Sequence, residues 1–117
     1  MGMVRHIKKQ SAVVRKIADS YFIHNLLTRK ESKNISLVVA EAKKHKEICR
    51  YSGGDRAYFV LKGSIKFKIG KKSFTARPGD VVFIPNNTRY HFQGTFRAII
   101  VNAPAFDKKY AQTTVVK

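Results

Sequence analysis

Residues 64–70, with the sequence SIKFKIG, alternate strictly between apolar and polar side chains. Ile65, Phe67 and Ile69 occupy every second position, and serine and lysine fill the positions between them. In an extended chain this spacing places all three apolar side chains on one face. The segment is therefore predicted to be a β-strand that buries one face and exposes the other.

Other short apolar segments of the chain are separated by turn signals in the same way. Gly70-Lys71-Lys72 is predicted to be a short hairpin connection, and Gly79 after Pro78 supplies a permissive turn. The further predicted strands include YFIHNLL (21–27), ISLVVAEA (35–42), RAYFVLKG (56–63), VVFIP (81–85) and FRAIIVNAP (96–104). Short strands at this spacing indicate an all-β sandwich or barrel.

The two ends of the chain have weaker patterns. Val13, Val14 and Ile17 share a face at helical spacing, which indicates a short helix. The expected organisation is a basic N-terminal extension over residues 1–19, a barrel domain over 20–112 and a tail over 113–117. The tail is expected to be either a last edge strand or disordered.

The charge of the chain is strongly unbalanced, with 24 Lys and Arg against 7 Asp and Glu, a net charge of +17. Such an excess attracts anionic small molecules, polyanions or acidic surfaces.

Cys49 is the only cysteine, so no intrachain disulfide is expected. No apolar run approaches the roughly 20 residues that span a bilayer, and the N-terminus lacks the apolar region of a signal peptide. A cytoplasmic protein without a membrane partner is the expectation.

The stretch YFVLKGSIKFKIGKKSFTARPGDVVFIPNNTRYHF resembles the core of a small single-domain cupin. Gly63 matches the glycine of the family's first motif, a PGD turn follows, and Gly79 with Pro85 five residues later matches the second motif. Asn87 replaces a family glycine, and Asn is the next best residue for a left-handed backbone. The resemblance implies a double-stranded β-helix, that is, a jelly-roll barrel.

The metal-binding positions of the family carry different residues in this chain. Counted from Gly63, the places of two histidines and a carboxylate fall on Arg50, Ser52 and Arg56, and the place of the last histidine falls on Tyr90. Arginine is not a ligand for a divalent cation. The resemblance therefore implies a barrel without a metal and without another cofactor.

A different register would restore some metal-binding side chains. His91 follows Tyr90 directly, so in a regular strand it points to the opposite face. A bulge could rotate it inward, and a shift of the first motif would offer His45, Glu47, Cys49 and Tyr51. A metal-dependent, dioxygenase-like cupin needs both changes together and stays the second alternative.

The residues at the replaced positions indicate an anion site. Two guanidinium groups, a hydroxyl and a phenol suit a carboxylate, a phosphate or a sugar phosphate. A buried arginine needs a partner, so Glu47, Asp55 or an anionic ligand pairs with it, unless these side chains lie at a wet rim. The predicted ligand-binding residues are Arg50, Ser52, Arg56, Tyr58, Tyr90 and His91. The candidates for proton transfer are Tyr90, His91 and Glu47, as in metal-free sugar isomerases on similar barrels.

Two classes of function remain. The first is a metal-independent cupin that binds a small anionic or sugar-like ligand, as a sensor, a binding module or an isomerase-type enzyme. A cluster of Arg50, Arg56 and Arg89 at the barrel mouth would favour this class. The alternative is a basic nucleic-acid-associated or structural module that uses the barrel as a scaffold. That alternative would be favoured by an outer stripe of basic residues: Lys8, Lys9, Arg15, Lys16, Lys43, Lys44, Lys46 and Lys66.

A homodimer is expected in addition, with residues 21–27 at or under the interface because they are too apolar for an exposed edge.

Overall fold

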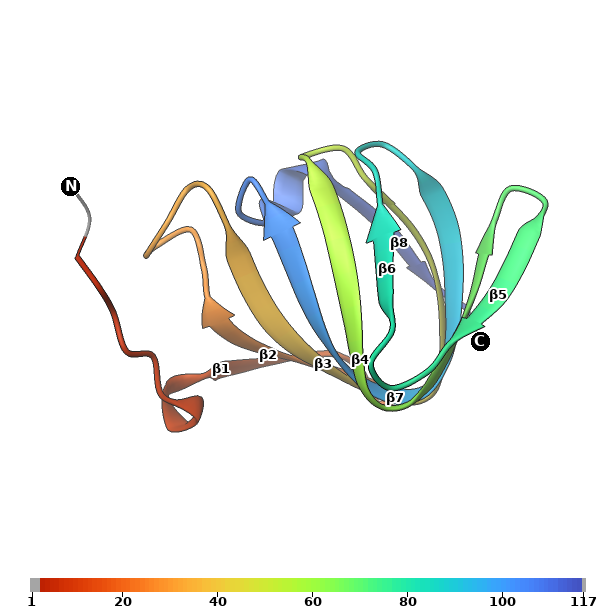
Figure 1. Cartoon of the computed structure of the whole chain (residues 1–117), viewed down its shortest axis with the longest axis horizontal. Helices are drawn as coiled ribbons and strands as arrows, with labels where there is room; N and C mark the ends of the chain where they lie inside the picture. Colours follow the sequence, from red (N-terminus) through yellow and green to blue (C-terminus); the bar gives the residue numbers. More distant parts are fainter. Residues whose placement is uncertain (1–2, 117) are drawn as a thin grey trace.

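The computed structural model describes residues 3–116, which form eight strands and two short 3-10 helices (Figure 1). In chain order the elements are η1 (Lys9–Ser11), β1 (Val13–Ala18), β2 (Tyr21–Leu27), β3 (Ser36–Tyr51), β4 (Asp55–Ile69), β5 (Lys72–Ala76), β6 (Val81–Ile84), β7 (Arg89–Ala103), η2 (Lys108–Tyr110) and β8 (Ala111–Val115). Within residues 3–116, no helix is long and apolar enough to cross a membrane. The predicted all-β architecture is confirmed.

All strand pairs are antiparallel, in the order β1-β2-β3-β7-β4-β5, with β6 paired to β4 and β8 paired to β3. The strands β3, β4 and β7 are long and strongly curved, so each contributes to both halves of the barrel (Figure 1). The inner faces of these three strands enclose the core and the cavity described below.

The turn residues explain why the chain reverses where it does. Ile69 pairs with Lys72, which leaves the two-residue loop Gly70-Lys71 between β4 and β5, with Gly70 at φ 61°. Gly79 adopts φ 94° and Asn87 φ 62°. The predicted hairpin and both predicted turns are confirmed, because these residues tolerate the left-handed region better than others do.

The helix indicated for the N-terminal segment is wrong. Residues 13–18 form the strand β1, which pairs with β2 from Val13 opposite Asn25 to Ala18 opposite Tyr21. The strand β2 has one edge on β3 and would otherwise leave its second edge unpaired, so pairing with β1 satisfies its backbone groups. At the other end of the chain, β8 pairs with β3 over residues 47–51.

A β-bulge in β3 changes which of its side chains face inward. The register with β7 shifts between Ala42 and His45, and Lys44 adopts φ 48° and donates its backbone N–H to Thr95 Oγ1 at 2.9 Å. One extra residue inverts the alternation of the strand that follows it. Before the bulge the even-numbered Ala40 and Ala42 are buried. After the bulge the buried residues are the odd-numbered His45, Glu47, Cys49 and Tyr51.

A second bulge, in β4, also inverts which side chains face inward. Its register with β7 shifts between Val60 and Lys62. Tyr58 and Val60 are buried before the shift, and Ile65 and Phe67 after it. No shift interrupts β7 itself, whose buried residues are even-numbered throughout: Tyr90, Phe92, Phe96, Ala98, Ile100 and Asn102.

The outer surface over β6, β4, β7 and β3 is apolar. Side chains that point outward lie in two rows set by the strand register. One row contains Val81, Phe59, Ile99 and Val39, and the other contains Phe83, Ala57, Val101 and Leu37. Phe59, Val81 and Phe83 keep 39%, 64% and 59% of their surface exposed. This apolar outer face, defined by those two rows, has no covering element in the described chain.

Candidate functional site

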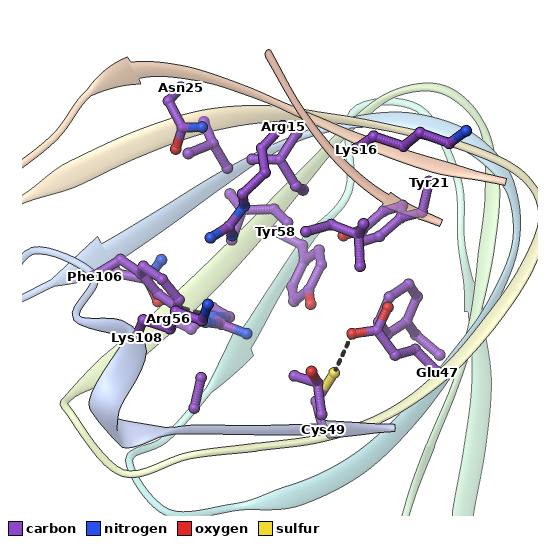
Figure 2. A pocket seen from close by; sticks show the side chains of 18 residues that line it. Arg15, Lys16, Tyr21, Asn25, Glu47, Cys49, Arg56, Tyr58, Phe106 and Lys108 are labelled. Atoms are coloured by element: carbon purple, nitrogen blue, oxygen red, sulfur yellow. Dashed lines mark hydrogen bonds between the residues drawn. The ribbon is translucent and has the colours of Figure 1, made fainter. Parts of the chain in front are cut away.

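A cavity of about 400 Å³ lies inside the barrel and opens beside β1 and η2 (Figure 2). Its walls come from the inner faces of β2, β3, β4 and β7. The polar side chains that line it are Arg15, Lys16, Tyr21, Asn25, Glu47, Cys49, Arg56, Tyr58, Asn102, Lys108 and Thr113. Four of these side chains are basic and one is acidic, so the cavity favours an anionic ligand.

Arg56 enters the cavity from β4 and is held by neutral partners. Its Nε donates to Asn102 Oδ1 at 2.8 Å, and its Nη1 donates to the phenolic oxygen of Tyr90 at 3.0 Å. Among residues 3–116 no carboxylate lies within ion-pair distance of Arg56. Burial alone would lower the pKa of Arg56, but Tyr90, Tyr58 and Cys49 together raise it, and the net shift is upward. The guanidinium is therefore a fixed positive charge without a protein counter-ion.

Tyr90 and Tyr58 extend this hydrogen-bonded chain into the barrel. Their hydroxyl groups lie 2.7 Å apart. Burial raises the pKa of Tyr90 to about 12, and Arg56 opposes that rise. Burial also raises the pKa of Tyr58 well above its ordinary value. Because Tyr90 accepts a hydrogen bond from a cation, it is the better acid of the two.

A second polar chain lies on β3. His45 Nε2 and Glu47 Oε2 are 2.7 Å apart, and His45 Nδ1 is 2.7 Å from Ser20 Oγ. Cys49 donates its thiol hydrogen to Glu47 Oε1 over 3.6 Å. The ring of His45 stacks on that of Tyr21 with 4.4 Å between centroids, which fixes its orientation. Glu47 is thus a buried carboxyl group that reaches the cavity and shares a hydrogen bond with a buried imidazole.

The two polar chains face each other across the cavity. Figure 2 shows Arg56 on one side, Glu47 on the other, and Tyr58 between them. Cys49 lies below Glu47 in the same view, but burial raises the pKa of its thiol, and Glu47 raises it further. Its thiol therefore stays protonated and is a poor nucleophile. A ligand that spans the cavity would meet the cation of Arg56 at one end and the hydrogen-bonded Glu47 and His45 at the other.

Aromatic rings support the positive groups at the mouth. The guanidinium carbon of Arg56 lies 4.8 Å from the ring centroid of Tyr51 and 5.9 Å from that of Phe106. Arg15 of β1 lies 6.0 Å from the same Phe106 ring. Lys108 of η2 lines the mouth beside them (Figure 2). Stacking on these rings holds the cations in place without neutralising them.

The sequence-predicted ligand residues do not all lie together. Tyr58, Tyr90 and Arg56 are inside the barrel, as expected for a pocket. Arg50 is exposed on the outer face of β3, and Ser52 is exposed where its hydroxyl donates to the carbonyl oxygen of Tyr110. The expectation that Arg50 and Ser52 look into the barrel is wrong. After the bulge in β3 the odd-numbered side chains face inward, so Arg50 faces outward, and Ser52 lies beyond the end of β3 at Tyr51.

His91 lies on the outer face, opposite to its neighbour Tyr90, as the strand alternation predicts. Its pKa is lowered by burial first and then by the positive charges of Arg89, Lys68 and Lys46. Arg89 is exposed on the same outer face. A cluster of Arg50, Arg56 and Arg89 at the mouth, which would favour the ligand-binding class, is therefore not formed.

The carboxylates that were candidate partners for Arg56 are engaged elsewhere. Glu47 bonds to His45, and Asp55 accepts the backbone N–H of Asn86 at 2.9 Å. Sequence reasoning missed Arg15, Asn102 and Lys108 as cavity residues. Asn102 could have been found as the only polar side chain at a buried position of FRAIIVNAP, but Arg15 and Lys108 enter only through the tertiary placement of β1 and η2.

The residues present do not fit the metal that many cupins hold. Within residues 3–116, no three side chains of His, Cys, Asp or Glu are placed to hold a metal ion. Glu47 is hydrogen-bonded to His45, the Cys49 thiol stays protonated because burial raises its pKa, and His91 faces outward. The remaining inward groups are a guanidinium and phenols, which are poor ligands for a divalent cation.

A model of the cupin domain family matches residues 43–102 of the sequence. The chain belongs to the cupin family. That match covers the segment from the bulge in β3 to Asn102 in β7, and so it contains Glu47, Arg56 and Tyr58 of the cavity. Among curated proteins, none matches this cupin significantly by sequence.

Solved structures resemble this cupin over nearly its full length. Streptomyces Pac13 with uridine has a TM-score of 0.79 at 15% identity, covering 97% of this chain and 92% of its own. Pac13 is described as a nucleoside dehydratase. Ectoine synthase from P. lautus has a TM-score of 0.77 at 14% identity, covering 98% and 91% of the two chains. KdgF from Halomonas sp. has a TM-score of 0.78 at 11% identity, covering 92% and 99%. These likenesses confirm the predicted cupin jelly-roll barrel.

Proposed function

We propose that this cupin binds a small organic anion in its barrel without using a metal ion. The anionic group of the ligand, a phosphate or a carboxylate, lies against Arg56, Arg15 and Lys108 at the mouth. The rest of the ligand is polar and sugar-like, and it extends toward Glu47 and Tyr58. The basic end of the cavity then holds the anionic group of the ligand, and the end at Glu47 and Tyr58 holds its uncharged polar part.

The observation that carries the proposal is the unpaired charge of Arg56. A guanidinium that is partly removed from water needs a counter-charge or several hydrogen bonds. The protein supplies two neutral acceptors, Asn102 and Tyr90, and Nη2 makes no hydrogen bond within residues 3–116. A planar anion can accept from Nη2 and balance the charge in one step. The solved neighbour with uridine makes nucleosides and nucleotides a first ligand class to test.

A second candidate function is acid–base catalysis on the bound anion. The hydrogen-bonded pair of Glu47 and His45 favours it, since a carboxylate at the cavity surface can accept a proton and the imidazole behind it can stabilise either state. Tyr58 lines the opposite side of the cavity and can donate a hydrogen bond to a developing negative charge, while Tyr90 is hydrogen-bonded to the hydroxyl of Tyr58. An isomerase or lyase reaction that begins with removal of a proton from carbon suits this set.

Thermal unfolding with candidate ligands tests the binding proposal. The panel contains inorganic phosphate, citrate, uridine, uridine monophosphate and hexose phosphates. All are compared at one ionic strength so that screening of the +17 charge is constant. A true ligand should raise the Tm saturably, because binding stabilises the folded state by RT ln(1 + [L]/Kd), about 2.7 kcal/mol at a hundredfold excess over Kd.

Three variants make the test specific to the cavity. Arg56→Gln should abolish the ligand-dependent shift, and Arg15→Gln, an exposed change at the mouth, should reduce it. Arg77→Gln is the matched control, since this arginine is exposed in the turn before β6, and it should respond as the parent does. Equal responses to every anion, or an unchanged response in both Arg56→Gln and Arg15→Gln, would contradict the proposal.

A further inference from the structure

The outer side of β3, β7 and β4 below the bulges carries a dense group of basic side chains. The strand register arranges them in three rows. The first row is Lys46, Gln93, Lys66 and Thr75, the second is Ile48, His91, Lys68 and Ser73, and the third is Arg50 and Arg89. We call these three rows the basic outer face. It lies on the opposite side of the sheet from Glu47 and Cys49.

The spacing of these rows brings the cations close together. Adjacent strands of a sheet lie about 4.8 Å apart, and side chains two positions apart on one strand lie roughly 6.6 Å apart. Five Lys and Arg residues of the three rows are exposed: Lys46, Arg50, Lys66, Lys68 and Arg89. None of the seven acidic residues of the chain falls in these rows. Positive charge therefore accumulates here without local compensation.

A shallow depression lies at the first row. Lys44, Lys46 and Lys66 surround it with Ser64, Thr75 and Gln93. Gly94 contributes to its floor, where a side chain would collide with the backbone oxygen of Ser64 at 2.3 Å. Ammonium, hydroxyl and amide groups all donate hydrogen bonds, so the depression is suited to the oxygens of a phosphate group.

The charge density of this face is also felt by His91, the residue at its centre. After burial, the causes that lower the pKa of His91 are Arg89, Lys68 and Lys46, one from its own strand and two from the neighbouring strands. No acidic group contributes to the shift. The surface thus has a positive potential that disfavours a further positive charge and attracts a negative one.

We propose that the basic outer face binds the phosphate backbone of double-stranded nucleic acid without reading its sequence. Phosphate contacts from Lys, Arg, Ser, Thr and Gln side chains position a protein on a duplex, whereas sequence is read at base edges in the grooves. The three rows lie on strands of the sheet, and no helix, an element that the major groove of a duplex admits, belongs to them. A duplex carries one negative charge per roughly 1.7 Å of its axis, enough to engage several of these cations at once.

The composition of the face favours a duplex over other polyanions. Binding of single strands relies on aromatic side chains that stack on bases, and the three rows contain no Phe, Tyr or Trp. Phe74 of β5 is exposed, but its ring stacks on Phe67 of the core at 5.6 Å. A membrane-binding surface combines basic groups with apolar side chains that enter the bilayer, and Ile48, the apolar residue of the rows, is half-buried.

The proposed function does not depend on this inference, and one experiment tests it separately. Fluorescence anisotropy with a labelled duplex of about 24 base pairs, titrated between roughly 50 and 300 mM KCl, gives the affinity and its salt dependence. The triple variant Lys46→Gln, Lys66→Gln, Lys68→Gln should bind at least about tenfold more weakly at roughly 100 mM salt. Its slope of log K against log salt should be shallower by about 0.9 for each phosphate that the variant no longer neutralises.

Matched variants and alternative ligands decide the outcome. The triple variant Lys9→Gln, Lys30→Gln, Lys33→Gln removes the same charge from exposed sites elsewhere and should bind as the parent does, and so should Arg56→Gln. Arg50→Gln with Arg89→Gln is a second test of the face. Equal losses in both lysine triples would overturn the proposal. Binding to phosphatidylserine vesicles without binding to the duplex would overturn it too, as would a roughly tenfold preference between two unrelated duplexes.

Discussion

Arg56 of β4 donates a hydrogen bond from Nη1 to the phenolic oxygen of Tyr90 of β7 at 3.0 Å. The backbone partner of Arg56 on β7 is Asn102, far along that strand from Tyr90. The contact with Tyr90 therefore crosses the barrel interior and joins parts of the sheet that are not paired. It ties the cation of the cavity to the Tyr58–Tyr90 pair.

Tyr90→Phe should lower the stability of the protein. The change removes one hydroxyl, which leaves Arg56 Nη1 and Tyr58 OH without their shared partner, and an unsatisfied buried polar group costs about 1–3 kcal/mol. Urea unfolding followed by circular dichroism would measure the shift in free energy of unfolding. Tyr110→Phe, at an exposed tyrosine, is the control and should leave stability unchanged. A Tyr90→Phe protein as stable as the parent would show that the cross-barrel contact is not needed.

Stability should fall as the pH rises through the range in which buried tyrosines ionise. The folded pKa of Tyr90 is about 12 against an ordinary value of 10, so its neutral form is favoured in the folded state. Its contribution, on the order of 3 kcal/mol, is complete below the ordinary pKa of 10 and is lost as the pH approaches about 12. Tyr21 and Tyr58, whose pKa values are raised by burial, act in the same direction.

The urea midpoint between about pH 8 and pH 12, read together with phenolate absorbance, would measure this loss. Tyr90→Phe should show a smaller loss than the parent over the same range. A midpoint that stays constant up to about pH 12 would contradict the burial of these phenols.

Glu47→Gln should separate binding from catalysis. The amide keeps the size of the side chain and its hydrogen bond to His45, but it cannot accept a proton. Anion binding should persist or tighten, because Glu47 is the one acidic side chain that lines the cavity among residues 3–116. If the acid–base candidate holds, ligand proton exchange in D2O, followed by NMR, should fall at least about a hundredfold. Glu41→Gln, on the outer surface, should exchange as the parent does, and undiminished exchange in Glu47→Gln would assign the base elsewhere.

Phe83→Lys should prevent self-association. We propose that the apolar outer face pairs with the same face of a second copy, with the outward side of residues 21–27 at its border through the pairing of His24 with Val39. The face consists of uncharged side chains, so two copies can meet there despite a net charge of +17 each. Light scattering at tens of micromolar should give a dimer for the parent and a monomer for Phe83→Lys.

The control for self-association is Val13→Lys on β1, where the side chain is 70% exposed outside the apolar outer face. It adds the same charge and should remain dimeric. A monomeric parent protein, or dissociation of both variants alike, would rule out this interface.

Local turn chemistry is the reason that the fold could be predicted from the sequence. Gly70, Gly79 and Asn87 adopt the left-handed backbone that their residue types favour, and the alternation in residues 64–70 identified the inward side of β4. Those signals act over a few residues and do not depend on distant contacts. The opposite orientations of Tyr90 and His91 followed from the same alternation.

The candidate site could be predicted only in part, because the bulge in β3 has no local signal. Lys44 adopts φ 48° without being Gly or Asn, and its conformation is supported by Thr95 from another strand. The family spacing counted back from Gly63 placed Arg50 inside, whereas the side chains of β3 that face inward after the bulge are His45, Glu47, Cys49 and Tyr51. Arg56, which lies on the next strand, β4, was placed correctly.

The extra residue at Lys43–Lys44 also has a consequence for how cupins of this kind diversify. Deleting one residue there would exchange the two sides of the rest of β3, bringing Lys46, Ile48 and Arg50 inward and expelling His45, Glu47 and Cys49. A single insertion or deletion, with no substitution at all, can therefore replace inward His and Glu side chains with inward Lys and Arg side chains. Gain and loss of a catalytic interior in such barrels can be sought in alignment gaps next to β-bulges as well as in changes of residue type.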